Sequence, residues 1–244
     1  MLQLFEAHIP KVHSTDLPMG KIALGQYMTP VPIAAFMASL FPTNFDVFHL
    51  LDAGAGEGSL TYAFLAALRH TGCSFPRGEI SLVEYDLHMV RNLEKNIPQA
   101  IDGLPVTPNI YHTDFIKYAS NLVLHKQRIF THAILNPPYK KISSQSTHRA
   151  LLRDVGIETV NLYTAFVALS LALLRPGGIL VAIIPRSFCN GPYYRPFRQY
   201  ILHNAAIRRL HLFTSRTEVF KADKVLQENI ILVLERDAKQ TAVN

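Results

Sequence analysis

The chain is 244 residues long, 49% hydrophobic and 17% charged, which argues against a disordered protein and suffices for one α/β domain whose core needs neither disulfides nor a structural metal. Its net charge of +6 is uneven, because residues 1–122 carry 7 Lys and Arg against 11 Asp and Glu, whereas residues 123–244 carry 17 against 7. The basic half predicts a face that binds a polyanion such as a phosphate backbone, with scattered solvated charge as the alternative.

Strand-like and helix-like patterns alternate along the whole chain. Strands are predicted at Phe45–Leu51, Glu79–Val83, Val106–Tyr111, Ile129–Leu135, Gly178–Ile184, Ile207–Phe213 and Leu226–Glu235, and helices at Pro32–Leu40, Ser59–His70, His88–Asn96, Asn161–Leu174 and Tyr194–His203. This alternation predicts an α/β fold with a doubly wound, mostly parallel sheet of seven strands. The last two strands lack an intervening helix, so we expect an antiparallel edge, and Lys140–Glu158 is expected to be a long polar loop.

Two glycine-containing segments stand early in the chain. Gly25–Pro30 precedes a short apolar helix and by composition is only a helix start, although it is placed to close over a ligand. Asp52-Ala53-Gly54-Ala55-Gly56-Glu57-Gly58 follows the first strand and opens a helix, where glycines let backbone N–H groups approach a ligand closely. The G-x-G-x-G spacing differs from the dinucleotide fingerprint and favours a smaller nucleoside ligand, with a structural turn as the alternative.

Acidic residues end the next two strands. Glu84 is placed to accept hydrogen bonds from two ribose hydroxyls, whereas Asp86 is better explained as the N-cap of the following helix. After the third strand, Asp114 is expected to accept from an adenine amino group while Phe115 packs on the ring. A helix cap and a core phenylalanine are the alternative for that pair. Together these strand ends predict a nucleoside pocket.

Asn136-Pro137-Pro138-Tyr139 follows the fourth strand and is the most informative motif. In open α/β sheets, ligands bind just beyond the carboxyl ends of the strands. The Asn136 amide oxygen and the Pro137 carbonyl can accept hydrogen bonds from one planar amino group, and the two prolines hold them in place. Tyr139 offers a flat face for stacking. The motif therefore favours methylation of an amino nitrogen, with an ordinary β-turn as the alternative.

Several other features narrow the class of protein. Phe220 precedes the final strand and is placed to supply a second aromatic face opposite Tyr139, although a core position is simpler. Cys73 and Cys189 lack metal-ligand spacing, and the 11 His show no H-x-x-x-H pair, so hydrolase and metal chemistry get little support. No signal-peptide pattern is visible, and the apolar run Leu162 to Leu174 is too short to span a bilayer. We therefore expect a soluble cytoplasmic protein.

These motifs, in this order, resemble the γ group of amino-methyltransferases that act on adenine N6 in DNA, typified by restriction–modification enzymes. Asn-Pro-Pro-Tyr alone is shared with RNA-modifying and protein-glutamine methyltransferases. Lys140-Lys141-Ile142 and Gln26-Tyr27-Met28-Thr29-Pro30 are similar to the DNA enzymes in particular. The resemblance covers nearly the whole chain: Gly25–Pro30, Asp52–Gly58, Glu84, Asp114-Phe115, Asn136–Tyr139, Asn161–Gly178 and the loop of Phe220.

The resemblance implies a class I, Rossmann-like fold and methyl transfer from S-adenosylmethionine to a flipped adenine. Asn136, Pro137, Pro138 and Tyr139 would form the catalytic motif, Tyr139 and Phe220 would stack on the base, and no metal or strong base is needed. The implied cofactor-binding residues are Tyr27, Thr29, Asp52, Gly54, Gly56, Gly58, Glu84, Asp114 and Phe115, and the implied phosphate contacts are Lys140 and Lys141.

In this family a target-recognition domain usually follows the final strand, and here the chain stops at Asn244. We therefore expect residues 1–244 to form a single catalytic domain without a separate recognition domain. Recognition would come from a longer parent protein, from a partner such as a recognition or endonuclease subunit, or from short loops. Methylation of RNA or of a protein glutamine, and a non-catalytic S-adenosylmethionine-binding subunit, are the alternative functions.

Overall fold

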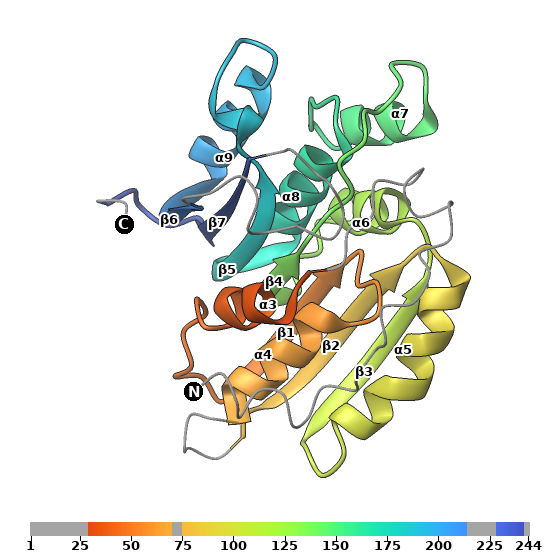
Figure 1. The fold of residues 1–244 in the computed structure, drawn as a ribbon. Coiled ribbons are helices and arrows are strands. Elements are labelled where there is room, and N and C mark those ends of the chain that lie inside the picture. The colour runs from red at the N-terminus through yellow and green to blue at the C-terminus, as the bar shows by residue number, and fades with distance from the viewer. Residues whose placement is uncertain (1–28, 70–74, 214–227, 242–244) are drawn as a thin grey trace.

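The computed structural model describes residues 29–69, 75–213 and 228–241, which form a seven-stranded sheet in the order β3-β2-β1-β4-β5-β7-β6 (Figure 1). The strands are β1 (Val47–Ala53), β2 (Arg77–Glu84), β3 (Val106–His112), β4 (Phe130–Leu135), β5 (Leu174–Pro185), β6 (Ala205–Leu212) and β7 (Asn229–Arg236). Neighbouring strands pair in parallel along the first five positions of the sheet, β3, β2, β1, β4 and β5. Strand β7 is antiparallel to both β5 and β6. The predicted mostly parallel sheet is confirmed, with β7 inserted one position inside the edge.

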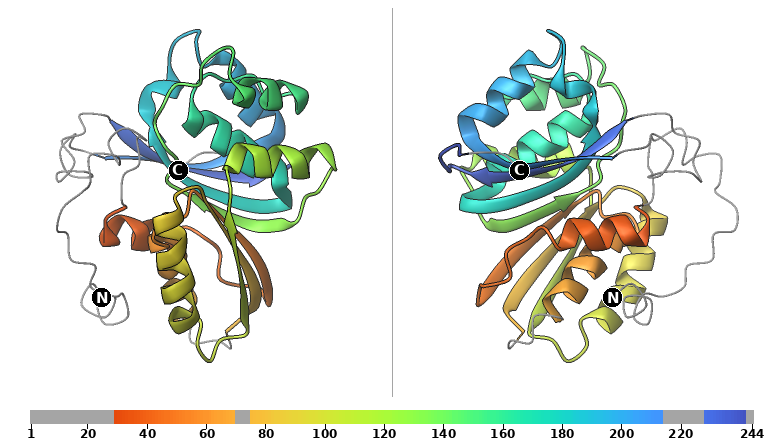
Figure 2. Two further views of the ribbon diagram at one scale, coloured as in Figure 1. Left: turned by 90° about the vertical axis from the view of Figure 1, so that its right-hand side faces the viewer. Right: turned by 60° about the vertical axis from the view of Figure 1, so that its left-hand side comes forward.

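Helices cover both faces of the sheet (Figure 2). Residues of α3 (Val31–Ala38), α4 (Ser59–Arg69) and α5 (Leu87–Ala100) share one apolar core, and those of α6 (Phe115–Leu124), α8 (Leu162–Leu173) and α9 (Arg195–Asn204) share the other. Successive strand residues point to opposite faces, so Leu50 belongs to the first core and Leu51 to the second. Burial on both faces explains why the strands read as continuous apolar runs.

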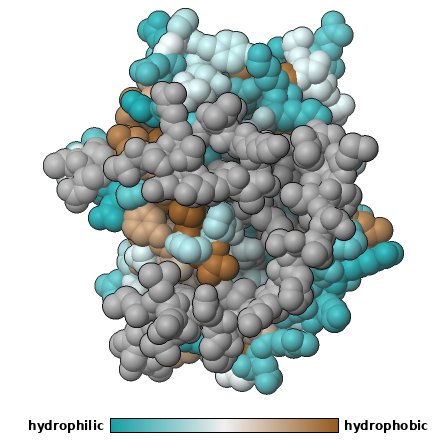
Figure 3. Space-filling model, in the orientation of Figure 1, coloured by the Kyte–Doolittle hydropathy of each residue, from teal (hydrophilic) through white to brown (hydrophobic). Residues whose placement is uncertain are grey.

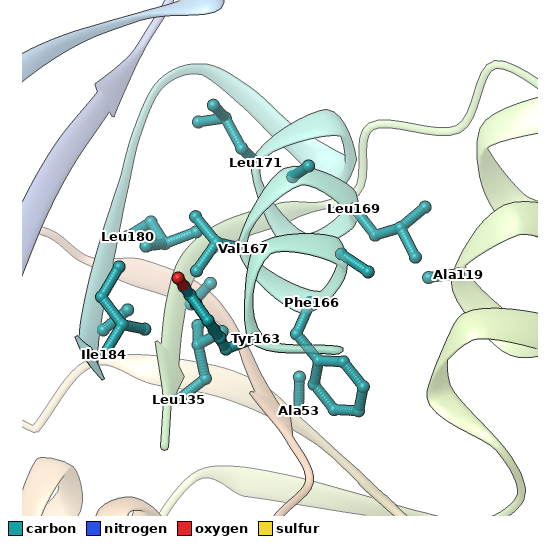
Figure 4. Packing of buried hydrophobic residues seen from close by; sticks show 14 of the residues in the cluster. Ala53, Ala119, Leu135, Tyr163, Phe166, Val167, Leu169, Leu171, Leu180 and Ile184 are labelled. Carbon is teal, nitrogen blue, oxygen red and sulfur yellow. The ribbon is translucent and has the colours of Figure 1, made fainter. Parts of the chain in front are cut away.

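Helix α8 is buried on almost every side and links the second core to the carboxyl ends of the strands. Figure 4 shows Val167 and Tyr163 of α8 beside Leu135 of β4 and Leu180 and Ile184 of β5, all of them buried. The same figure shows the ring of Phe166 near Ala53. Because helix and strands pack along their length, the first turn of α8 is held at the end of the sheet where the site-candidate loops emerge.

Two helices are absent from those predicted at the outset, although the helix cap considered for Asp114 implied the first of them. Helix α6 follows Asp114, and α7 (Thr147–Asp154) lies inside the segment that was expected to be a long loop. The Ser146 side chain caps α7 by accepting from the Arg149 N–H, and only Arg149 and Leu152 of this helix are buried. The expectation of an irregular loop is wrong for these eight residues, because their short and mainly polar pattern gives little local signal. In the described part of the chain, no helix is long and apolar enough to cross a membrane.

Candidate active site

A cavity of about 480 Å³ lies at the carboxyl ends of β1 to β4. This volume is in the range of small-molecule binding sites. Segments that follow the four strands form most of its wall, and residues near the starts of α7 and α8 complete it. The structure thereby brings together nine of the residues singled out from the sequence: Gly54, Gly56, Glu84, Asp114, Phe115, Asn136, Pro138, Lys140 and Lys141.

Glu84 is fixed on the cavity wall by backbone donors. Its side chain is 2% exposed and accepts N–H groups from Gly56 at 2.9 Å and from Tyr85 and Asp86 at 2.8 Å each. Gly56 has a φ of 56°, a conformation that glycine adopts without strain. The carboxylate therefore joins the glycine loop to the end of β2. Asp86 caps α5 by accepting from the next helical N–H groups, as the sequence indicated.

Asp114 is a helix cap and Phe115 is a core residue, as the alternative for this pair held, and both also line the cavity. Asp114 Oδ1 accepts from the Lys117 N–H at 3.0 Å and so caps α6, while its Oδ2 lies 2.9 Å from His148 Nε2. Phe115 is buried but still lines the cavity, and its ring centroid lies 4.7 Å from that of Phe166. His148 and Phe166 also line the cavity. Sequence reasoning missed both, because His148 was assigned to a loop and Phe166 stands in an apolar run.

Asn136 has its amide orientation set by two neighbours. Its Nδ2 donates to Thr29 Oγ1 at 3.0 Å, and the Tyr139 hydroxyl donates to Asn136 Oδ1 at 3.3 Å. With Nδ2 engaged by Thr29, the amide presents its oxygen as the acceptor. Thr29 was expected to hold a cofactor. In the described residues its hydroxyl instead binds Asn136, and Thr29 is absent from the cavity wall.

The residues after the Asn136–Tyr139 motif are tied to the start of α8. The Leu162 N–H donates to the Lys140 carbonyl at 2.8 Å, and the Ile142 N–H donates to the Val160 carbonyl at 2.7 Å. Lys140 and Lys141 themselves are exposed at the rim of the cavity. This short antiparallel pairing fixes the position of the motif relative to α8.

Asp52 and Gly58 support the glycine loop from behind and do not line the cavity in the described structure, which differs from the cofactor contacts expected for them. Asp52 is 1% exposed and accepts from Thr61 Oγ1 at 2.7 Å. Burial raises the pKa of Asp52 to about 7; the two hydrogen bonds from Thr61 oppose this rise and the charge of Glu84 adds to it. Gly58 has a φ of 87°, where a side chain is strained, and a Cβ there would stand 3.0 Å from Leu93, so both effects favour glycine.

Tyr27 and Phe220, expected to contact the cofactor and the substrate base, lie outside the described residues. Within residues 29–69, 75–213 and 228–241, no group of three or more His, Cys, Asp or Glu side chains is arranged to hold a metal ion. Cys189 is a free thiol whose pKa is raised, first of all by burial. The residues that line the cavity offer hydrogen-bonding groups, charge and aromatic faces.

Comparison with known proteins assigns the chain to one protein family. A sequence model of the Eco57I restriction-modification methylase family matches residues 79–220. The chain is 46% identical over 253 residues to the Type II methyltransferase M.BsuBI of Bacillus subtilis, covering 100% of this chain and 50% of that protein. The chain spans about half the length of the curated relatives it matches.

Solved structures identify the fold. A type I restriction-modification methyltransferase subunit from Streptococcus thermophilus superposes with a TM-score of 0.71 at 20% identity, over 88% of this chain and 46% of that one. A Listeria monocytogenes protein described as a class I S-adenosylmethionine-dependent methyltransferase gives 0.66 at 16% identity, over 88% and 64%. The fold is that of the class I methyltransferases.

Proposed function

This chain belongs to the Eco57I restriction-modification methylase family, and on that premise we propose that it transfers a methyl group from S-adenosylmethionine to the N6 amino group of adenine in DNA. The observation that carries the proposal is the Asn136 amide at the cavity wall, with its oxygen turned to accept by the bond from Nδ2 to Thr29. An acceptor fixed in this way suits an amino nitrogen as the substrate.

The cavity fits S-adenosylmethionine as the cofactor. Glu84 offers carboxylate oxygens to ribose hydroxyls, and Gly54 and Gly56 leave the backbone accessible at the loop between β1 and α4. Phe115 and Phe166 supply apolar faces for a purine. When bound, this cofactor supplies a methyl group on a positively charged sulfur.

The residues of the chain then act by position and charge. Asn136 Oδ1 accepts a hydrogen bond from the target amino group and lies where positive charge grows on the nitrogen during transfer. Thr29 keeps that oxygen in place. By the resemblance, Tyr139 stacks on the base and the Pro137 carbonyl is the second acceptor; both residues stand next to cavity-lining residues but are not part of the described cavity wall. Holding both reactants in line lowers the barrier, and no strong base is required.

DNA binds along the basic half of the chain, with the target adenine flipped out of the helix to reach Asn136. Lys140 and Lys141 are exposed at the rim and contact phosphates. Phosphate contacts alone give salt-sensitive binding that does not depend on base sequence. We therefore infer that residues 1–244 are the catalytic unit of a cytoplasmic restriction–modification system, and that a further domain or a recognition or endonuclease partner reads the target site.

Incubation of the purified chain with methyl-labelled S-adenosylmethionine tests the proposal, with unmethylated genomic DNA, RNA and bulk protein in parallel reactions. We expect label in DNA as N6-methyladenine. Asn136→Ala should abolish transfer and leave the cofactor Kd within about twofold, because Asn136 contacts the substrate nitrogen. Label only in RNA or protein would overturn the substrate. Cofactor binding without transfer to any of the three would favour a supporting subunit.

A further inference from the structure

A continuous set of tyrosine rings leads from the Asn136–Tyr139 motif to the surface. Tyr139 meets Tyr163 edge to face, with ring centroids 6.1 Å apart. Tyr163 lies 6.0 Å from Tyr194, and Tyr194 lies 5.4 Å from Tyr193. Tyr163 belongs to α8, whereas Tyr193 and Tyr194 stand in the loop between η2 (Arg186–Cys189) and α9. Three ring contacts thus connect the proposed base-stacking residue to an exposed loop.

Several hydrogen bonds tie this loop to the rest of the fold. The Tyr194 hydroxyl accepts from Asn161 Nδ2 at 2.8 Å, and the hydroxyls of Tyr163 and Ser187 lie 3.2 Å apart. Arg198 donates to three main-chain carbonyls: that of Phe188 in η2 at 2.9 Å, and those of Asn190 and Gly191 in the loop at 3.3 Å and 2.7 Å. A guanidinium used in this way fixes the backbone that presents Tyr193.

Tyr193 is 55% exposed. An aromatic side chain that is already held in place loses little conformational entropy when a ligand covers it, so its burial contributes strongly to binding. Arg195 is exposed two residues further on, at the start of α9. The loop projects from the top of the molecule in Figure 1, and the corresponding surface in Figure 3 is mainly teal to pale, with little brown. A rigid aromatic with a cation beside it, in a hydrophilic setting, suits a nucleic-acid strand better than an apolar protein face.

We propose that Tyr193 is a stacking platform for an unpaired base next to the target adenine, and that Arg195 contacts the adjoining phosphate. The inference rests on the proposed function and deepens it, because it specifies where the strand leaves the active site. A base has a π-face whatever its identity, so the platform holds the strand without reading its sequence. The planar guanidinium of Arg195 matches phosphate geometry.

Fluorescence anisotropy with the full chain and a fluorescein-labelled adenine-containing single strand tests the platform. We expect Tyr193→Ala to raise the Kd by about 5- to 150-fold, the range for loss of one base–aromatic stack. Tyr193→Phe should retain affinity, and Tyr193→Leu should lose it. On an abasic strand of equal length, Tyr193→Ala should match the wild type, because no base is present to stack.

The phosphate contact has a matched control. Arg195→Gln should lower the slope of log Kd against log salt by about 1, the loss of one phosphate contact. Arg175→Gln removes an exposed arginine at the amino end of β5 and should leave the slope unchanged. Unchanged melting temperatures and cofactor Kd values would show that the variants fold and keep the cofactor site.

Failure of the Tyr193 platform and failure of the proposed DNA methylation would give different results. A wild-type chain that binds no DNA would overturn both. A wild-type chain that binds DNA, with Tyr193→Ala equal to it or with Tyr193→Leu as good as Tyr193→Phe, would overturn the platform alone. Equal losses on the normal and abasic strands would also overturn it, since they would show a backbone contact in place of stacking.

Discussion

Replacing Asp52 with Asn should reveal how much the buried carboxyl opposes folding at neutral pH. Asp52 is 1% exposed, its Oδ2 accepts from Thr61, and its Oδ1 has no hydrogen-bond partner among the described residues. The variant keeps an acceptor for Thr61 and removes the ionisable group. Because Asp52 lies behind the cavity wall, the protein is best measured without cofactor.

The magnitude follows from the two pKa values. The native pKa of about 7 stands above the ordinary value of 3.8, so the unfolded state loses its proton first and is favoured as the pH rises. At about 1.4 kcal/mol per pH unit, the penalty grows from near pH 4 to near pH 7 and reaches about 4 kcal/mol. Between pH 5 and pH 8 the difference in unfolding free energy between wild type and Asp52→Asn should therefore shift by about 3 kcal/mol in favour of the variant.

Urea unfolding of both proteins at half-unit steps from pH 5 to pH 8 measures this difference. For a chain of this size the shift equals about 6 to 12 °C in melting temperature, so thermal unfolding is a second readout. An unsatisfied Asn amide adds a cost that does not vary with pH, and only the slope of the difference matters. Asp46→Asn, at an exposed position just before β1, is the control and should give a flat difference. A flat difference for Asp52→Asn as well would refute a buried carboxyl with a raised pKa.

Three further predictions concern the site and the core. Glu84→Gln replaces one acceptor of the three N–H bonds with a donor, so calorimetry should show cofactor affinity reduced by about 10- to 100-fold; unchanged affinity would remove Glu84 from the ribose site. His148→Ala frees Asp114 Oδ2 and should weaken cofactor binding severalfold, with His148→Gln restoring part of it; equal Kd values for all three proteins would show that the contact is incidental. Burial lowers the pKa of His132 to about 4, so native stability should fall as the pH drops from about 6.5 to about 4, by about 3 kcal/mol. His132→Leu should lack this loss in urea unfolding, and equal acid sensitivity would contradict it.

The strand ends of the site were predictable because each residue carries its signal locally. Glu84 and Asn136 directly follow apolar runs, and Gly54 and Gly56 stand between a strand and a helix. In a parallel sheet such positions converge at one edge, so chain order alone places them around one cavity. The residues that line the cavity at the ends of β1 to β4 could therefore be predicted without knowledge of tertiary contacts.

The remaining wall depends on contacts between distant segments. His148 reaches the cavity only because α7 packs beside α6, where its Nε2 meets Asp114. Arg149 is buried and forms an ion pair with Glu158, so a charged residue lies on the inner face of α7, where a sequence pattern would lead one to expect an apolar residue. Thr29 meets Asn136 across 107 positions of sequence. No local pattern encodes such pairs.

The placement of β7 between β5 and β6 has a consequence for how the protein is made. Residues Ile179–Pro185 of β5 pair with Asn229–Glu235, and most of the side chains in this pairing are fully buried. During synthesis, β5 leaves the ribosome more than forty residues before its partner. Until β7 has been synthesised, the apolar edge of β5 lacks its hydrogen-bonding partner and can pair with a strand of another chain. We therefore expect a nascent chain that ends between these two segments to aggregate more readily than one that includes β7.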